Sequence, residues 1–263
     1  MPTIRDFATA KANRQKIVVV TSYDAWSARL LAVTPVDCLL VGDSVMMVVH
    51  GERDTLGATV ELMTLHTRAV ARGAPGKLIV ADFPFLAARQ GIGPALECAA
   101  QLMRAGAHAV KIEGIRGHED VIRHLVQSGV PVMGHLGLQP QSVHALGGYR
   151  VQGREAAEAS QLREDAAALE EAGAFSIVLE CIPGKLAREI TAERSIPTIG
   201  IGAGPDCDGQ VLVLQDLLGL NPDFKPRFVR TFVDGTTQLS GGVSRFAAAV
   251  RKGSFPSTKE TFK

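Results

Sequence analysis

The sequence predicts an α/β protein of the (β/α)8, or TIM-barrel, class, and three observations lead to this prediction. The chain has 263 residues, and a single barrel of this kind usually has about 250. Short apolar runs rich in Val, Ile and Leu recur along it without clean alternation, as in strands buried on both faces of a parallel sheet. Longer amphipathic stretches lie between most of the runs, and four of them end at a Gly, which caps a helix and turns the chain into the next strand.

The apolar runs predict eight strands, which in chain order cover Ile17–Val20, Cys38–Gly42, Leu78–Ala81, Ala109–Ile112, Val130–Gly134, Ser176–Leu179, Thr198–Ile201 and Val211–Leu214. The amphipathic stretches predict helices over Ala25–Val33, Val60–Arg72, Pro94–Ala105, His118–Ser128, Glu155–Ala172 and Lys185–Arg194. A doubly wound open sheet is the alternative topology. No G-x-G-x-x-G motif follows the first run, and eight strands with intervening helices favour a closed barrel.

The domain organisation is predicted to be simple, because no linker interrupts the chain. We expect one barrel domain over residues 1–263, in which residues 221–263 form a C-terminal cover or an oligomer contact. This last segment departs from the alternation of strands and helices, contains three prolines, and has one predicted helix around Val243–Arg251.

The charge and cysteine content exclude several functional classes. The 28 basic and 27 acidic residues give a formal charge of +1 without any basic run, so neither a nucleic acid nor a membrane surface is an expected partner. The N-terminus does not resemble a signal peptide, and no apolar stretch is long enough to cross a bilayer. The four cysteines form no C-x-x-C pair, which favours reduced thiols in the cytoplasm over a zinc or redox site.

Ionisable residues gather where the predicted strands end. In a (β/α)8 barrel the active site lies at the C-terminal ends of the strands, so these side chains are expected on one rim. They lie at the ends of the second to the sixth strand, and they are Asp43 with Ser44, Asp82, Lys111 with Glu113, His135, and Glu180.

These residue types suggest a metal site with a base beside it. Asp43, Asp82 and Glu113 resemble the ligands of Mg²⁺, which takes one or two carboxylates and keeps water or substrate in its other positions. Lys111 would place a positive charge there for a carboxylate or an enolate oxygen. Glu180, set apart from that cluster, is the candidate general base.

Simpler interpretations of the same residues stay open at this point. An Asp at a strand end often only caps the following turn or helix. Lys111 and Glu113 are two residues apart on one strand and would form an ion pair on the same face. His135 is either a metal ligand or a hydrogen-bond donor.

Seven segments together resemble the ketopantoate hydroxymethyltransferase family. The similarity runs from about Thr21 to about Leu220, in order and at the family's spacing. The segments are Val41–Ser44, Val80–Phe85, Val110–Gly114, Gly134–Gln141, Gly147–Tyr149, Leu179–Cys181 and Ile199–Gly204.

The resemblance implies a specific activity. The family transfers a hydroxymethyl group from 5,10-methylenetetrahydrofolate to 3-methyl-2-oxobutanoate and forms 2-dehydropantoate, on the route to pantothenate and coenzyme A. It also implies Mg²⁺, a barrel fold and, in bacterial members, a homodecamer of two pentamer rings. For the metal, the resemblance implies Asp43 and Asp82 as direct ligands and Glu113 as a ligand through water. It implies Glu180 as the base. It also implies that Ser44, Lys111 and His135 lie at the keto acid, which Asp43 and Asp82 contact as well.

Two positions depart from the family pattern. Met46 stands where the family has Gly, and Gly57 stands where it has Pro. Both lie in the loop after the second strand, so they are expected to change the shape or mobility of this loop. They leave the metal and base positions unchanged.

Two alternative functions remain. A Mg²⁺-dependent keto-acid lyase or mutase of the phosphoenolpyruvate mutase and isocitrate lyase type would use similar acidic residues, but usually with a catalytic Cys in a loop. Cys98 falls in a predicted helix and Cys181 directly follows Glu180, which argues against this alternative. A non-catalytic barrel that binds a small molecule would be expected to lack the charges at the strand ends.

Overall fold

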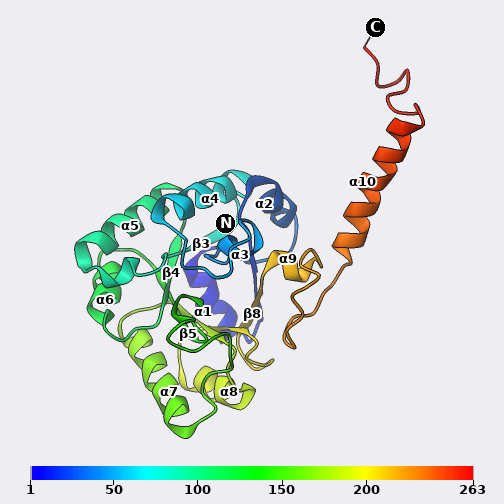
Figure 1. Ribbon diagram of the computed structural model, residues 1–263. Helices are drawn as coiled ribbons and strands as arrows, with labels where there is room; N and C mark the ends of the chain where they lie inside the picture. The colour runs from blue at the N-terminus through cyan, green and yellow to red at the C-terminus, as the bar shows by residue number, and fades with distance from the viewer. Residues whose placement is uncertain (1, 263) are drawn as a thin grey trace. The chain divides into compact units, whose positions relative to one another are not determined.

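The computed structural model describes residues 2–262 and contains a closed barrel of eight parallel strands (Figure 1). Each strand pairs with the next one in the chain, and the last pairs with the first. The prediction of a (β/α)8 barrel is therefore confirmed. The strands are β1 (Ile17–Thr21), β2 (Cys38–Val41), β3 (Leu78–Asp82), β4 (Ala109–Glu113), β5 (Val132–Gly137), β6 (Ser176–Glu180), β7 (Thr198–Ile201) and β8 (Gly209–Leu212).

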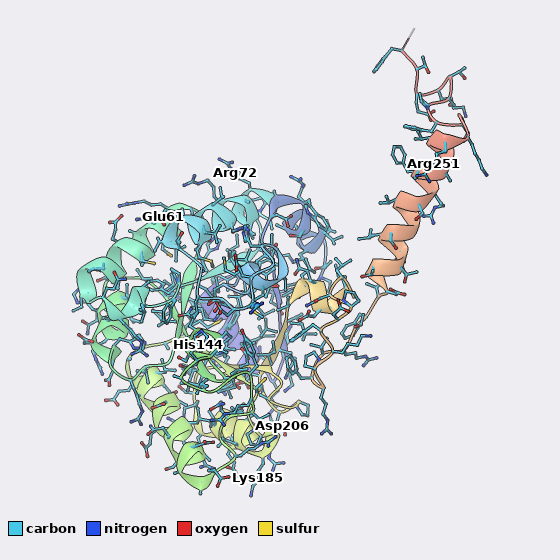
Figure 2. All side chains as sticks on the ribbon, in the orientation of Figure 1. Glu61, Arg72, His144, Lys185, Asp206 and Arg251 are labelled. Carbon is cyan, nitrogen blue, oxygen red and sulfur yellow. The ribbon has the colours of Figure 1, made fainter. Side chains whose placement is uncertain are left out.

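Helices between the strands surround the barrel (Figure 1). They are α2 (Ala25–Ala32), α4 (Val60–Gly73), α5 (Ile92–Arg104), α6 (Glu119–Gln127), α7 (Ala156–Glu171) and α8 (Gly184–Glu193), with a short α3 (Val45–Val48) after β2. Charged side chains such as Glu61, Arg72 and Lys185 are exposed and point away from the barrel (Figure 2). The six predicted helices are thus confirmed to within two residues at each end.

Six strands match the prediction to within one residue at each end, and two differ by more. The fifth strand was expected over Val130–Gly134, whereas β5 covers Val132–Gly137, because the glycines that suggest a stop lie inside the ladder. The eighth was expected over Val211–Leu214, whereas β8 begins two residues earlier, at Gly209.

The helix α1 (Ile4–Ala12) closes the N-terminal end of the barrel and was not predicted. Its Phe7 is 2% exposed and packs with the first residues of the strands in the barrel core, and its ring meets Phe175 edge to face at 5.5 Å. Lys11 donates to Asp208, just before β8, at 2.8 Å. Because this end is filled by apolar side chains, a polar site is restricted to the opposite, C-terminal end.

The chain forms two compact units, Met1–Val213 and Leu214–Lys263. The second contains α9 (Leu214–Leu217) and α10 (Gly235–Arg251), which is longer than the predicted helix around Val243–Arg251. Asp234 caps α10 by accepting from the Thr237 amide.

The role predicted for residues 221–263 stays a prediction. The first and last residues of the predicted domain, 1 and 263, lie outside the described residues. Within residues 2–262, no helix is both long enough and apolar enough to cross a membrane.

Candidate active site

The register of the barrel makes neighbours of the polar residues at the strand ends. Asp82 on β3 lies opposite Lys111 on β4, and Glu113 on β4 lies opposite His135 on β5. Together with Asp43, which follows β2, these side chains are buried, and none is more than 9% exposed. Buried charges cost free energy unless they are paired or hold an ion, so this cluster requires an explanation beyond strand capping.

Lys111 is the central cation of the cluster. Its Nζ lies 2.9 Å from Asp82 Oδ1. Lys111 therefore pairs with Asp82 on the neighbouring strand, and not with Glu113 on its own strand as the simpler interpretation supposed. Burial alone would lower the pKa of the Lys111 ammonium, but the carboxylates of Asp82, Glu113 and Asp43 raise it. Lys111 is therefore charged at neutral pH.

Asp43 and Asp82 face one another across β2 and β3. The Asp43 amide donates to Asp82 Oδ2 at 3.0 Å. Burial raises the pKa of each carboxyl to about 6, and the negative charges around them add to this effect, chiefly from Glu113 on Asp43 and from Asp43 on Asp82. The pair thus carries negative charge that Lys111 does not fully offset, and a bound cation would stabilise it.

The donor set fits Mg²⁺ better than a metal that needs a full protein cage. Among residues 2–262, no group of three or more His, Cys, Asp or Glu side chains is arranged to hold a metal. Glu113 Oε1 is buried, and His135 Nδ1 lies 3.5 Å from it. The carboxylates of Asp43 and Asp82, with Glu113 near enough to raise the pKa of Asp43, suit Mg²⁺, which takes one or two carboxylates and keeps several waters.

His135 connects the candidate base to the cluster. Its Nε2 lies 3.1 Å from Glu180 Oε2 and its Nδ1 lies 3.5 Å from Glu113 Oε1. Burial and the Lys111 ammonium favour a neutral ring, but the hydrogen bonds to Glu113 and Glu180 outweigh them and raise the pKa of His135 to about 9. Glu180 was expected to stand apart from the other charges, which is wrong, because His135 on β5 bridges the two groups.

Ser44 has a partner that sequence reasoning missed. Its hydroxyl lies 2.8 Å from the hydroxyl of Tyr23, which is buried in the loop after β1 and whose pKa is raised by that burial. A signal was available, because Tyr23 lies three residues after the first predicted strand, where a residue at the same rim of the barrel is expected.

Gln141 is a second residue that was missed. Its amide nitrogen donates to Asp43 Oδ2 and to the Phe83 carbonyl, each at 2.8 Å. Its backbone N–H donates to Glu113 Oε2 at 3.1 Å. Both side-chain partners are acceptors, so the amide orientation is fixed. Gln141, which lies in the segment after β5, therefore bonds to groups at the ends of β2, β3 and β4.

Comparison with known proteins identifies the family. The sequence profile described as ketopantoate hydroxymethyltransferase matches residues 2–258. The chain belongs to this family. A ketopantoate hydroxymethyltransferase relative from Bdellovibrio bacteriovorus, named 3-methyl-2-oxobutanoate hydroxymethyltransferase, is 52% identical over 262 residues, which is 100% of both chains. Relatives with the same name are 48% identical in Francisella tularensis subsp. novicida, over 99% of this chain and 98% of the relative, and 49% identical in Coxiella burnetii, over 95% of each.

Solved structures with this fold are more distant in sequence. Phosphonopyruvate hydrolase in complex with oxalate and Mg++ superposes with a TM-score of 0.63 at 14% identity, over 99% of this chain and 93% of the other. A 2,3-dimethylmalate lyase of the PEP mutase/isocitrate lyase superfamily gives 0.61 at 19% identity, over 100% and 93%. These similarities support the barrel fold alone.

The two departures from the ketopantoate hydroxymethyltransferase pattern touch each other. Met46 and Gly57 both lie in the segment between β2 and α4 (residues 42–59), here called the β2–α4 loop. A Cβ on Gly57 would lie 3.0 Å from Met46 Cε, and Met46 is 8% exposed. Met46 thus fills the space that a larger residue at position 57 would need, so the two departures act as one packing change.

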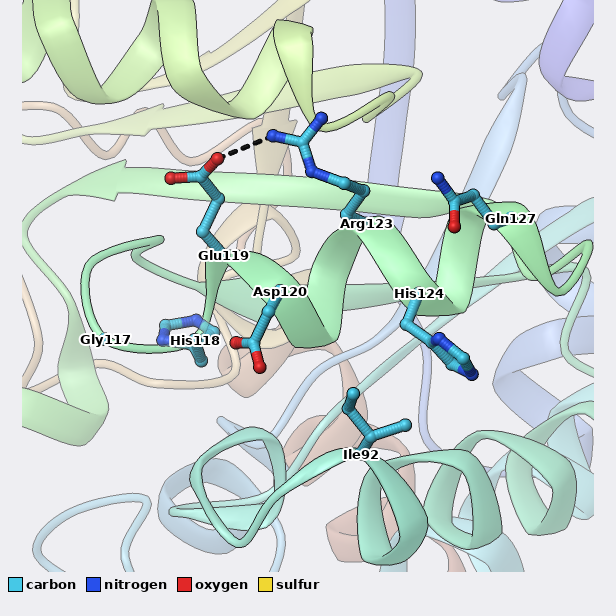
Figure 3. A pocket seen from close by; sticks show the side chains of 8 residues that line it. All are labelled: Ile92, Gly117, His118, Glu119, Asp120, Arg123, His124 and Gln127. Atoms are coloured by element: carbon cyan, nitrogen blue, oxygen red, sulfur yellow. Dashed lines mark hydrogen bonds and ion pairs between the residues drawn. The ribbon is translucent and has the colours of Figure 1, made fainter.

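A separate cavity of about 580 Å³ lies between α5 and α6 (Figure 3). Ile92 of α5 faces Asp120 and His124 of α6 across it, and Glu119 pairs with Arg123 at its edge. None of the residues predicted for the ketopantoate hydroxymethyltransferase site lines this cavity.

Proposed function

We propose that this protein transfers a hydroxymethyl group from 5,10-methylenetetrahydrofolate to 3-methyl-2-oxobutanoate and so forms 2-dehydropantoate, a precursor of pantothenate and coenzyme A. The observation that carries the proposal is the single cluster of Asp43, Asp82, Lys111, His135 and Glu180 at the C-terminal rim of the barrel. The name of the relatives, 3-methyl-2-oxobutanoate hydroxymethyltransferase, supports the same reaction.

Asp43 and Asp82 would hold Mg²⁺ directly, and Glu113 would reach it through water. When bound, Mg²⁺ supplies a Lewis acid that draws electrons from the keto acid and makes its C3 hydrogen more acidic.

The side chains of the protein would bind the keto acid and remove its proton. Lys111 and Ser44 hold the keto acid, with the Lys111 charge near the developing enolate. Glu180 removes the proton from C3, and His135, 3.1 Å away, orients its carboxylate. The C3 carbon then bonds to the methylene carbon, and both bonds from this carbon to the folate nitrogens break. Water provides the hydroxyl oxygen, and the C3 proton and the second water hydrogen end on the two freed nitrogens, which gives tetrahydrofolate.

The test follows the C3 hydrogen of 3-methyl-2-oxobutanoate by proton NMR in heavy water, with and without Mg²⁺, before methylenetetrahydrofolate is added. We expect Mg²⁺-dependent loss of the signal and then 2-dehydropantoate. Glu180→Gln should still bind Mg²⁺ and keto acid but lose the exchange, whereas Glu171→Gln, an exposed carboxylate on α7, should exchange normally. No exchange and no product from folded wild-type protein with Mg²⁺ would refute the proposal.

The two cysteines considered for the lyase alternative are both buried. Cys98 lies within α5 and is 3% exposed. Cys181 is 9% exposed and burial raises its pKa to about 12. A reactive thiolate needs a lowered pKa and exposure, so neither residue supports that chemistry.

Self-association is supported by α10. Four exposed apolar side chains recur along it at intervals of four, three and four residues, which places them on one face; they are Leu239, Val243, Phe246 and Val250. We infer that this face contacts another copy of the chain within a homodecamer. Light scattering should give ten times the mass of one chain, and Val243→Glu should lower it; an unchanged mass would remove α10 from the interface.

We also infer a cytoplasmic protein without nucleic-acid or membrane partners. The net charge is +1, and the four cysteines are free and buried, as is usual in a reducing compartment.

A further inference from the structure

The loop between β5 and α7 (residues 138–155), here called the β5–α7 loop, begins and ends beside the candidate base. The Leu138 amide donates to the Glu180 carbonyl at 2.8 Å, and the Gln152 amide donates to the Cys181 carbonyl at 2.9 Å. Both ends of the loop are therefore anchored at the end of β6, where Glu180 lies.

This loop also meets the β2–α4 loop, which carries Asp43 and Ser44. Tyr149 donates its hydroxyl hydrogen to Met47 Sδ at 3.7 Å, and His144 Nε2 lies 4.0 Å from Asp54 Oδ2. The loop that carries Asp43 and Ser44 and the loop that carries Gln141 are thus joined next to the site.

Tyr149 is exposed although it stands near the charged cluster. Its side chain is 49% exposed. Partial burial and the carboxylates of Asp54, Asp43, Glu180 and Glu113 raise its pKa, so the ring lies within electrostatic reach of the strand ends. A large aromatic face left in water beside an active site is a favourable surface for a ligand ring.

The backbone before Tyr149 has open space around it. Gly147 and Gly148 have φ of 69° and 109°, which favour Gly. A Cβ added to either would meet no atom within 4 Å, so this turn has open space around it while both ends of the loop are fixed.

We propose that Tyr149 is the residue on which the aromatic rings of the folate co-substrate stack. The inference rests on the function proposed above, because the small keto acid has no ring to place there. The pteridine and aminobenzoyl groups are flat and aromatic, and stacking on Tyr149 would remove its exposed face from water while leaving the one-carbon group beside the site.

Two arginines near Tyr149 fit the rest of a folate molecule. Arg150 and Arg154 on the β5–α7 loop are exposed. Their guanidinium groups suit the carboxylates of a glutamate tail.

Phe85 provides the comparison, because it is another exposed aromatic residue, three positions after Asp82. Its side chain is 39% exposed. It lines a cavity of about 350 Å³ between α4 and α5, which Tyr149 does not line. Phe85 is therefore not expected to bind the folate rings.

The experiment compares wild-type protein with Tyr149→Ala, Tyr149→Phe and Phe85→Ala. We measure the KM for methylenetetrahydrofolate, the equilibrium binding of tetrahydrofolate by calorimetry, and the folate-free exchange of the C3 hydrogen. Tyr149→Ala should raise KM and Kd for folate about tenfold, while Tyr149→Phe, which keeps the ring, should stay near wild type. Phe85→Ala should not change either constant.

The outcomes separate this inference from the proposed function. If wild-type protein neither exchanges the C3 hydrogen nor forms product, the proposed function fails. If exchange is normal but Tyr149→Ala leaves the folate KM and Kd unchanged, the Tyr149 inference is wrong. An equal effect of Phe85→Ala, or an effect of Tyr149→Ala on the keto-acid exchange alone, would also overturn it.

Discussion

Replacing Lys111 by Met tests the electrostatic account of the site most directly. Met has a similar length and no charge, so it removes the cation with little change in volume. Lys111 Nζ lies 2.9 Å from Asp82 Oδ1, and the two side chains are 5% and 2% exposed. The variant therefore leaves the buried carboxylates of Asp82 and Asp43 without their main cation.

The expected loss of stability depends on pH. Removing one partner of a buried ion pair costs about 3–5 kcal/mol. The pKa of Asp43 and of Asp82 is raised to about 6 by burial, so both are ionised above that pH and neutral below it. Lys111 stabilises only the ionised forms, so its contribution is present above about pH 6 and is lost as the pH falls through 6. We expect the full loss at pH 8 and about 1 kcal/mol or less at pH 5, from packing alone.

Urea unfolding of metal-free protein at pH 8 and pH 5 measures this difference. Lys185→Met, an exposed lysine on α8, is the matched control and should change the free energy of unfolding by less than about 0.5 kcal/mol at either pH. A Lys111→Met loss of equal size at both pH values would show that Lys111 acts through packing. A variant more stable than wild type at pH 8 would refute the electrostatic reasoning.

Three further substitutions test the site. Asp82→Ala should weaken Mg²⁺ binding at least about tenfold by calorimetry, since it removes one of two proposed direct ligands; unchanged affinity would exclude Asp82 as a ligand. Gln141→Ala frees the Asp43 carboxylate and should lower Mg²⁺ affinity by about 10-fold to 100-fold, as loss of a residue that orients a metal ligand does; wild-type affinity would limit Gln141 to a structural role. Gly137 has a φ of 91°, and a Cβ on it would lie 2.1 Å from the Glu180 carbonyl oxygen. Gly137→Ala should therefore cost more than about 2 kcal/mol in thermal unfolding, and a smaller loss would show that β5 and β6 can separate without penalty.

The fold was predictable because the strands are mostly apolar without alternation and the helices between them are amphipathic. The parts that failed depend on contacts across the chain. The helix α1 has one fully buried residue, Phe7, so its sequence gives no clear apolar face. Gly134 and Gly137 look like turn residues, but Gly134 packs under Leu169 and Gly137 allows the close approach of Glu180.

The candidate site was predictable in its residues but not in its connections. Strand ends are set by local sequence, so Asp43, Asp82 and Lys111 were found without tertiary information. The partner of Lys111 depends on the register of β3 and β4, which no local pattern fixes. Gln141 was missed for a similar reason, since its three bonds reach residues 28 to 98 positions away.

The seal that α1 makes at one end of the barrel has a kinetic consequence. Phe7 and the core residues around it close that end. Substrates and products would therefore enter and leave through the same opening, at the C-terminal end of the barrel. On the proposed function, the keto acid would be held near Asp82 at the strand ends, deeper than a folate stacked on Tyr149 in the loop. Keto acid should therefore bind first, and tetrahydrofolate should leave before 2-dehydropantoate. Product-inhibition kinetics would test this order. Tetrahydrofolate should then inhibit in an uncompetitive or noncompetitive manner with respect to keto acid.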